Sequence, residues 1–309
     1  MLGLFKEITA AYLVSVVAGG IGILVFAYEV LGWAFLQSYL IVFLWALLCT
    51  SGFISLAQRK NKKVNKLLDD CDIENFLAIY QRLMGRKRMM GKETTRMVEL
   101  NIIVGQLMLG ESGIAGRLLG EFGREKLPGS RAGALHEFVY HNNQFLYLLN
   151  TGDHSGAAQA LERMDGVLRN PKMPRSCLQP YRDFLSRQRQ TLSVENGNYN
   201  GAEEFFAAAF ESAGREMDRV STQLMLGKIY LYQGRVSEAV GALEYVVQHG
   251  GSSIHRAKAT ERLEALGITI PAPPPKKPPV QVFSALERAG LVAYCIVVVA
   301  AALLAIISS

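Results

Sequence analysis

The chain has 309 residues, half of them hydrophobic, and a formal net charge of +6. Its apolar residues gather near the two ends, at 10–57 and 289–307, and the middle has an ordinary soluble composition. The four cysteines include no Cys-x-x-Cys pair, so the sequence favours neither a zinc site nor a disulfide-stabilised scaffold.

Two apolar segments near the N-terminus are each long enough to cross a bilayer. Residues 10–30 carry one charge, Glu29, at their far end, and residues 35–57 carry none. Because about 20 apolar residues suffice for a spanning helix, we expect a transmembrane hairpin within residues 1–57. A cleaved signal peptide is the alternative, but the first apolar run is too long for one and a second run follows at once.

Small and aromatic residues mark how this hairpin would pack. Ala11, Ser15 and Gly19 recur at every fourth position of the first span, a spacing that lets helix backbones approach closely. Their face would pack against the second span or, alternatively, against another membrane protein. Tyr28 and Trp33 flank the turn, where interfacial aromatic residues are expected.

A third apolar segment, residues 289–309, contains no charged residue and predicts a C-terminal transmembrane anchor. A proline-rich linker precedes it at 269–288, and its residues 271–279 should form extended polyproline II, either as a spacer or as a docking site for an SH3-like or WW-like domain. No ionisable residue lies deep in any of the three segments, which argues against a transporter or a proton relay.

Basic residues follow the second span and define a juxtamembrane helical segment at 58–91. We expect the following side chains to attract anionic lipid headgroups: Arg59, Lys60, Lys62, Lys63, Lys66, Arg86, Lys87 and Arg88. The hairpin turn has no Lys or Arg, so the positive-inside rule places residues 58–288 in the cytoplasm. A bacterial cytoplasmic membrane is the expected setting, with a mitochondrial or endoplasmic-reticulum membrane as the alternative.

The region between the apolar ends predicts helices joined by short turns. The expected helices cover 73–85, 92–109, 113–123, 130–150, 154–167, 175–195, 199–213, 215–233, 236–249 and 253–265. Turn residues such as Gly110, Pro128–Gly129, Gly152, Gly197 and Gly234 separate them. Asp72 is expected to cap the first of these helices. Repeated helix pairs with short loops are typical of an α-solenoid, so the fold class is all-α.

One helix pair carries a recognisable motif, L-G-x-x-Y-x-x-x-G-x-x-x-x-A-x-x-x-L. Its marked positions are Leu226, Gly227, Tyr230, Gly234, Ala239 and Leu243. This pattern resembles the tetratricopeptide repeat, in which small residues allow two antiparallel helices to cross closely and a glycine ends the first helix. The resemblance implies a TPR-like solenoid over residues 92–268 that binds other proteins.

Three earlier helix pairs repeat only the second half of the motif. Glycines at 110, 152 and 197 are followed by alanine after five residues and by Leu119, Leu161 or Phe206 after nine. These glycines and Gly234 follow one another at intervals of 42, 45 and 37 residues, more than the roughly 34 usual for the family. Ile103, Phe145 and Gln190 stand where Gly227 stands, so these three repeats are degenerate.

The resemblance also implies a groove lined by the first helix of each pair. Its candidate protein-binding residues are Arg182, Arg189, Gln190, Gln223, Lys228 and Tyr232. No catalytic motif accompanies them: His136 and His141 are five residues apart, which turns the two imidazoles about 140° away from each other on a helix. We therefore expect no enzyme activity, no metal or other cofactor, no small-molecule substrate and no nucleic-acid partner.

The sequence thus predicts a membrane-anchored scaffold or adaptor that binds other proteins beside an anionic lipid surface. The alternative is an accessory subunit of an envelope-biogenesis or secretion complex, assembled through its transmembrane helices. The order of hairpin and repeats resembles that of bacterial HemY proteins, although the C-terminal apolar segment departs from that arrangement.

Overall fold

The computed structural model describes residues 6–30, 35–85, 87–123, 130–270 and 278–307, and their regular secondary structure is entirely helical. The chain divides into two compact units. The first unit contains the described residues up to Val64, those of 87–94 and those from Pro279 onward. The second unit contains residues 65–85 and the described residues of 95–278.

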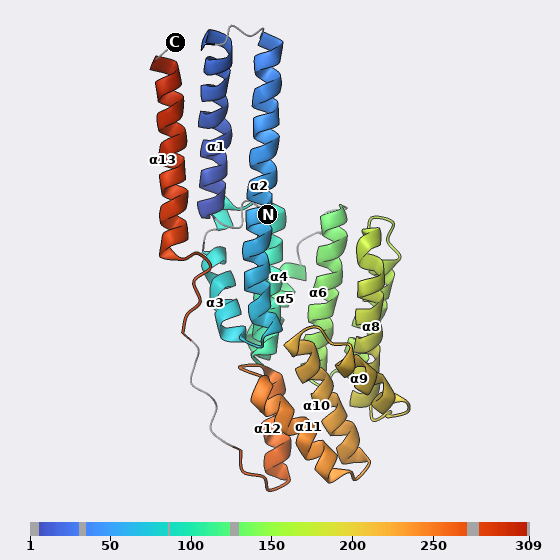
Figure 1. Cartoon of the computed structure of the whole chain (residues 1–309). Helices are drawn as coiled ribbons and strands as arrows, with labels where there is room; N and C mark the ends of the chain where they lie inside the picture. The colour runs from blue at the N-terminus through green and yellow to red at the C-terminus, as the bar shows by residue number, and fades with distance from the viewer. Residues whose placement is uncertain (1–5, 31–34, 86, 124–129, 271–277, 308–309) are drawn as a thin grey trace. The chain divides into compact units, whose positions relative to one another are not determined.

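The first unit is built around three long helices (Figure 1): α1 (Lys6–Val25), continued by the π-helix η2 (Phe26–Val30); α2 (Phe35–Asp69), whose last residues belong to the second unit; and α13 (Ala285–Ile307). Within the residues that the structure describes, two helices are long and apolar enough to cross a membrane, over Ile8–Tyr28 and Leu40–Asp69. Trp33 of the predicted hairpin turn lies outside the described residues. The second apolar helix does not end near residue 57 but continues through the basic segment to Asp69.

Small residues of α1 pack against both neighbouring helices. A side chain at Gly19 would approach the Trp45 ring of α2 to 2.8 Å, and the Trp45 indole N–H donates to the Ser15 carbonyl at 2.8 Å. On α13, the backbone of Ala302 covers Gly22, and the Tyr294 hydroxyl accepts from the Ser15 hydroxyl at 3.1 Å. Since both α13 contacts occur in the same order along the two helices, α1 and α13 run parallel.

The second unit contains the predicted helices, and their ends differ from the expected ones by at most three residues. The helices are α3 (Ile73–Met84), α4 (Lys92–Met108), which begins in the first unit, α5 (Ser112–Gly123), α6 (Arg131–Asn150), α7 (His154–Leu168), α8 (Arg175–Glu195), α9 (Ala202–Glu211), α10 (Glu216–Tyr232), α11 (Val236–His249) and α12 (Ile254–Ala265). A short 3-10 helix, η3 (Lys87–Met89), precedes α4 in the first unit. Pro128–Gly129 lie outside the described residues.

The same turn joins α4 to α5, α6 to α7, α8 to α9 and α10 to α11. In each, a glycine (110, 152, 197 or 234) adopts a positive φ between 74° and 83°. In the last pair, Gly234 N–H donates to the Leu231 carbonyl and Arg235 N–H donates to the Tyr230 carbonyl, at 3.1 and 2.9 Å. The other three turns have equivalent bonds, which satisfy carbonyls left over at the helix end.

Five residues after each of these glycines, an alanine is completely buried. These are Ala115, Ala157, Ala202 and Ala239, each with an exposed fraction of 0%. The large residues that follow, Leu119, Leu161, Phe206 and Leu243, are buried as well. The four pairs therefore share one local construction.

The core of the second unit passes from helix to helix in chain order. One cluster joins α4, α5 and α6 around Ile103, the next joins α6, α7 and α8 around Phe145, and a third joins Val194 of α8 to α9–α12. Neighbouring clusters share a helix, α6 or α8. Burial thus occurs mainly between elements that are close in the sequence.

The start of α3 shows where the expected capping was wrong. Asp72 occupies the position before the helix but makes no capping bond; its carboxylate accepts from the Asn75 side chain at 3.1 Å. Instead, the Ser252 hydroxyl accepts from the Ile73 N–H at 3.1 Å, and the Ser252 N–H donates to the Cys71 carbonyl at 3.2 Å. The turn before α12 therefore supplies the cap of α3, which local sequence could not indicate.

Candidate binding surfaces

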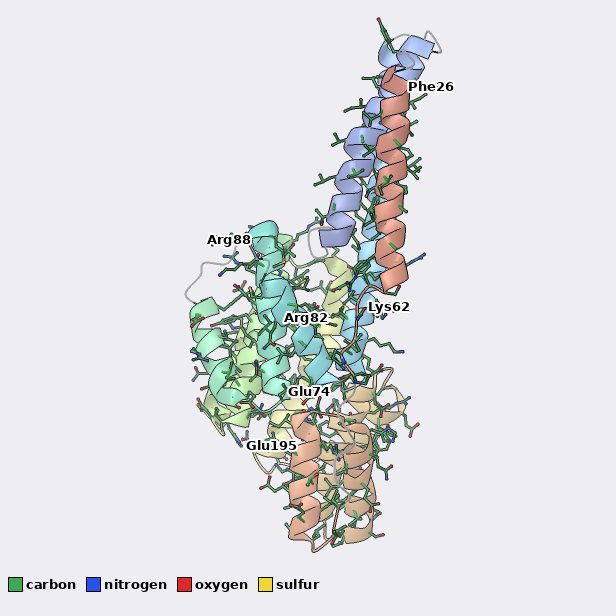
Figure 2. The ribbon with its side chains drawn as sticks, turned by 90° about the vertical axis from the view of Figure 1, so that its left-hand side faces the viewer. Phe26, Lys62, Glu74, Arg82, Arg88 and Glu195 are labelled. Atoms are coloured by element: carbon green, nitrogen blue, oxygen red, sulfur yellow. The ribbon has the colours of Figure 1, made fainter. Side chains whose placement is uncertain are left out.

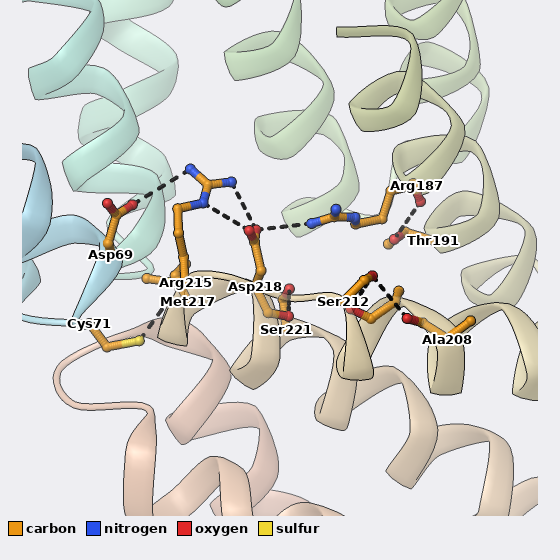
Figure 3. Close-up of polar contacts among 11 residues, drawn as sticks. Asp69, Cys71, Arg187, Thr191, Ala208, Ser212, Arg215, Met217, Asp218 and Ser221 are labelled. Atoms are coloured by element: carbon orange, nitrogen blue, oxygen red, sulfur yellow. Dashed lines mark hydrogen bonds and ion pairs between the residues drawn. The ribbon is translucent and has the colours of Figure 1, made fainter. Parts of the chain in front are cut away.

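An ionic network connects the end of α2 to two of the predicted groove helices, α8 and α10 (Figure 3). The Arg215 guanidinium lies 3.5 Å from the Asp69 carboxylate and donates to Asp218 at 2.8 Å, while Arg187 reaches Asp218 at 3.0 Å. The side chain of Asp218 is only 17% exposed, so two arginines share a largely buried carboxylate. Burial raises the pKa of Asp69, and the charge of Arg215 opposes that shift.

This network uses side chains of two helices, α8 and α10, on which partner binding was predicted. Arg187 on α8 and Asp218 on α10 are both engaged by the chain's own residues rather than open to a ligand. None of the network residues was among the predicted groove residues. Asp69 and Arg215 are far apart in the sequence, so no spacing rule could have paired them.

A second polar cluster surrounds Lys228, a predicted groove residue. Its ammonium donates to the Glu195 carboxylate at the end of α8, at 2.8 Å. Nearby, Lys258 of α12 donates to the Asn150 side chain at 3.0 Å, and burial lowers the pKa of Lys258 while Glu195 opposes that shift. Lys228 is thus held within the chain, with a side chain 20% exposed.

The other groove candidates are distributed over the surface. Arg189 turns toward α7, where Glu162 and Asp165 lie 3.5 and 3.7 Å away. Tyr232 is 67% exposed and stacks on Tyr199 with ring centres 4.0 Å apart. Arg182 is exposed, and Gln190 and Gln223 are partly exposed. Among themselves, the six candidates form none of the hydrogen bonds, ion pairs or ring contacts found in the described part of the chain.

The residues of the repeat motif occupy structural positions. Leu226, Gly227, Ala239 and Leu243 are buried, and a side chain at Gly227 would meet Leu243 at 2.9 Å. Tyr230 is partly buried beneath the Arg235 guanidinium, which lies 4.4 Å from the ring centre.

The basic residues after the second apolar segment face different surroundings. Lys60 is buried: its ammonium lies 2.5 Å from the Glu287 carboxylate and 4.6 Å from the centre of the Phe283 ring. The exposed residues are Arg59, Lys62, Lys63, Lys66, Lys87 and Arg88, of which Lys62 and Arg88 are labelled in Figure 2. Arg86 lies outside the described residues, as do positions 271–277 of the proline-rich linker.

The Lys60–Glu287 pair also stabilises the start of α13. Ser284 and Glu287 form reciprocal bonds: the Ser284 N–H donates to the Glu287 carboxylate at 2.8 Å, and the Glu287 N–H donates to the Ser284 hydroxyl at 3.1 Å. Together with Lys60, these bonds lower the pKa of Glu287 to about 2. The pair joins the first turn of α13 to α2.

Within the described residues, no group of three or more His, Cys, Asp or Glu side chains is arranged to hold a metal ion. The His141 ring lies 2.8 Å from the Gln144 amide oxygen, and burial lowers the pKa of His141.

Comparison of the chain with family models, with curated proteins and with solved structures finds no match. The function must therefore be argued from the molecule itself.

Proposed function

We propose that this chain is a membrane-anchored scaffold or adaptor that binds other proteins through a TPR-like α-solenoid of antiparallel helix pairs. The observation that carries the proposal is the turn shared by four consecutive helix pairs, each with a positive-φ glycine and a buried alanine five residues later. Repeated pairs whose cores continue from one to the next form solenoids, and solenoids present extended surfaces to protein partners.

In this proposal α1 and α2 form the transmembrane hairpin and α13 is the C-terminal anchor. Support comes from large apolar side chains of these helices that are exposed: Leu44 and Leu48 of α2 are 56% and 70% exposed, and Val297 of α13 is 65% exposed. Such surfaces are unfavourable in water and are matched by lipid. Because α13 packs along α1, it would act as a third member of a bundle rather than as an independent tail anchor.

The proposed orientation places residues 58–288 in the cytoplasm of a bacterium, against its inner membrane. The parallel course of α1 and α13 is compatible with this topology, because both helices would enter the bilayer from the side that carries the basic residues. Arg59, Lys62, Lys63 and Lys66 would then meet anionic headgroups.

We place the partner surface on the exposed part of the first helices, represented by Arg182 on α8 and Tyr232 on α10. These side chains are open to solvent, whereas Arg187, Asp218 and Lys228 are engaged within the chain. A partner would therefore contact α8 and α10 beside the internal ion pairs rather than displace them.

The test is affinity purification of the full chain from detergent-solubilised membranes, followed by mass spectrometry. The variants Arg182→Glu and Tyr232→Ser change the proposed surface, and Arg117→Glu is the charge-matched control on the exposed face of α5, a second helix. Loss of specific partners from the first two variants, but not from the control, supports the scaffold.

Two other outcomes contradict the proposal. If partners persist in all three variants but disappear when the outward-facing residues of α1 and α2 are changed, the chain is a subunit assembled through its apolar helices. If the purified chain turns over a substrate by itself, it is an enzyme. The first of these outcomes is the alternative function predicted from the sequence.

A further inference from the structure

Two apolar pockets lie next to each other beside α2 in the first unit and share Trp45 in their linings; together they are called the groove. Its lower part, the part nearer the basic segment that follows residue 57, has a volume of about 320 Å³. It is lined by side chains that include Leu48, Phe53 and Leu56 of α2 and Tyr294 of α13. An upper part of about 460 Å³ shares Trp45 with the lower part. The floor is open at Gly52, where an added side-chain carbon would meet no atom within 4 Å.

The basic segment continues the face of α2 that lines this groove. Successive residues of an α-helix turn by about 100°, so Lys63 lies about 20° and Arg59 about 60° from the direction of Leu56. Lys62 lies about 120° away, outside the line of the groove. Two exposed positive charges, Arg59 and Lys63, thus follow the lower end of the apolar groove along α2.

The charge at this end is not neutralised by the neighbouring acid. Glu287 is paired with Lys60 at 2.5 Å and bonded to the Ser284 N–H. Lys63 lies 3.5 Å from the carbonyl of Gln281, a contact that leaves its charge in place. An anionic group at this position would therefore meet two cations, Arg59 and Lys63, that form no ion pair with the residues the structure describes.

The dimensions of the lower groove fit one leaflet of a bilayer. Trp45 and Leu56 are eleven residues apart, which is about 16 Å along a helix. Half of the roughly 30 Å hydrocarbon core is about 15 Å. An acyl chain whose headgroup lies near Arg59 would therefore end close to Trp45.

We propose that the lower groove between α2 and α13 holds one acyl chain of an anionic phospholipid, whose phosphate is bound by Arg59 and Lys63. The inference rests on the proposed membrane anchoring. It goes beyond general attraction to a charged surface, because it assigns one lipid to one site. The alternative occupant, an additional transmembrane helix, would explain the apolar lining but not the alignment of the two cations with the groove.

The test is native mass spectrometry of the full chain in a mild detergent, with phosphatidylglycerol and phosphatidylcholine of identical acyl chains as probes. The headgroup variants are Arg59→Gln and Lys63→Gln, and Lys62→Gln is the charge-matched control. Gly52→Leu fills the open floor of the groove, and Ser51→Leu adds apolar volume on the exposed neighbouring face of the same helix.

We expect selective retention of one phosphatidylglycerol molecule. One basic residue near an anionic headgroup contributes about 1 kcal/mol, so each headgroup variant should weaken retention about fivefold and the double variant about thirtyfold. Gly52→Leu should abolish retention of that one molecule, whereas Lys62→Gln and Ser51→Leu should leave it unchanged.

Equal retention of phosphatidylglycerol and phosphatidylcholine overturns the inference. So does a loss of lipid retention in the control variants that equals the loss in the headgroup and groove variants. A co-purifying protein crosslinked to the groove, with no lipid retained, also overturns it in favour of a helix partner. Alkaline carbonate extraction of membranes separates this failure from failure of the anchoring itself. A chain that stays in the membrane but retains no lipid refutes only the lipid site, and a chain that is extracted refutes the anchoring.

Discussion

Replacing Gly227 by alanine tests the close crossing of α10 and α11 directly. The added methyl group would lie 2.9 Å from the Cγ and Cδ2 atoms of Leu243, whose side chain is completely buried and so has little room to move. Overpacking of this kind costs about 1 to 3 kcal/mol, and the better helix propensity of alanine returns about 0.5 to 1 kcal/mol. We expect a net loss of stability of about 0 to 2.5 kcal/mol.

Gly241→Ala is the matched control, because Gly241 is exposed within α11 and has no atom within 4 Å of an added side-chain carbon. It should stabilise the chain by about 0.5 to 1 kcal/mol. Hydrogen exchange of the full chain, followed in peptides of α10 and α11, measures both effects as opening free energies. Equal stabilisation by the two variants would refute the close crossing.

Three further substitutions probe other parts of the second unit. Asp218→Asn should weaken the bonds to Arg187 and Arg215 and lower the stability of α10 by about 1 to 3 kcal/mol, and unchanged exchange in α10 would show that the network contributes nothing. Gly234→Ala should cost about 1 to 2 kcal/mol because φ is +74° there, and urea unfolding of the full chain that matches wild type would contradict the left-handed turn. Burial lowers the pKa of His255 from 6.5 to about 4, so the folded imidazole stays neutral down to about pH 4 while that of the unfolded chain is protonated below pH 6.5. About 3 kcal/mol of stability is therefore lost as the pH falls from 6.5 to about 4. His255→Phe should remove this loss of stability. If hydrogen exchange of α12 keeps the same pH dependence in the variant, the loss does not come from His255.

The helices of the second unit could be predicted because their signals are local. A glycine that can adopt a positive φ, followed by a small residue and then a large one, marks both the end of one helix and the packing of the next. The degenerate pairs kept this signal even where Ile103, Phe145 and Gln190 replaced the glycine of the first helix. The family resemblance rested on the same residues, so it indicated a fold rather than a ligand.

Charged residues were predicted less well than turns. Lys60 belonged to a run of basic residues expected at the lipid surface, yet the structure buries it against Glu287, a residue 227 positions away. Asp72 had the position and chemistry of a helix cap, but Ser252 provides that cap. In both cases the partner comes from a distant part of the chain. A polar side chain can bond to several alternative partners, and local sequence does not indicate which one folding brings close.

The sequence by itself determined the helices of the second unit, to within three residues at each end, and the presence of two apolar segments near the N-terminus, because hydrophobic periodicity and glycine turns act over a few residues. Only the tertiary structure decided which surfaces remain open. It joined Asp69 to Arg215, paired Lys60 with Glu287, and brought Tyr294 of α13 beside α2 to line the apolar groove. The physical reason is that ion pairs and grooves form between elements brought together by folding, and their energies depend on distances that no local pattern encodes.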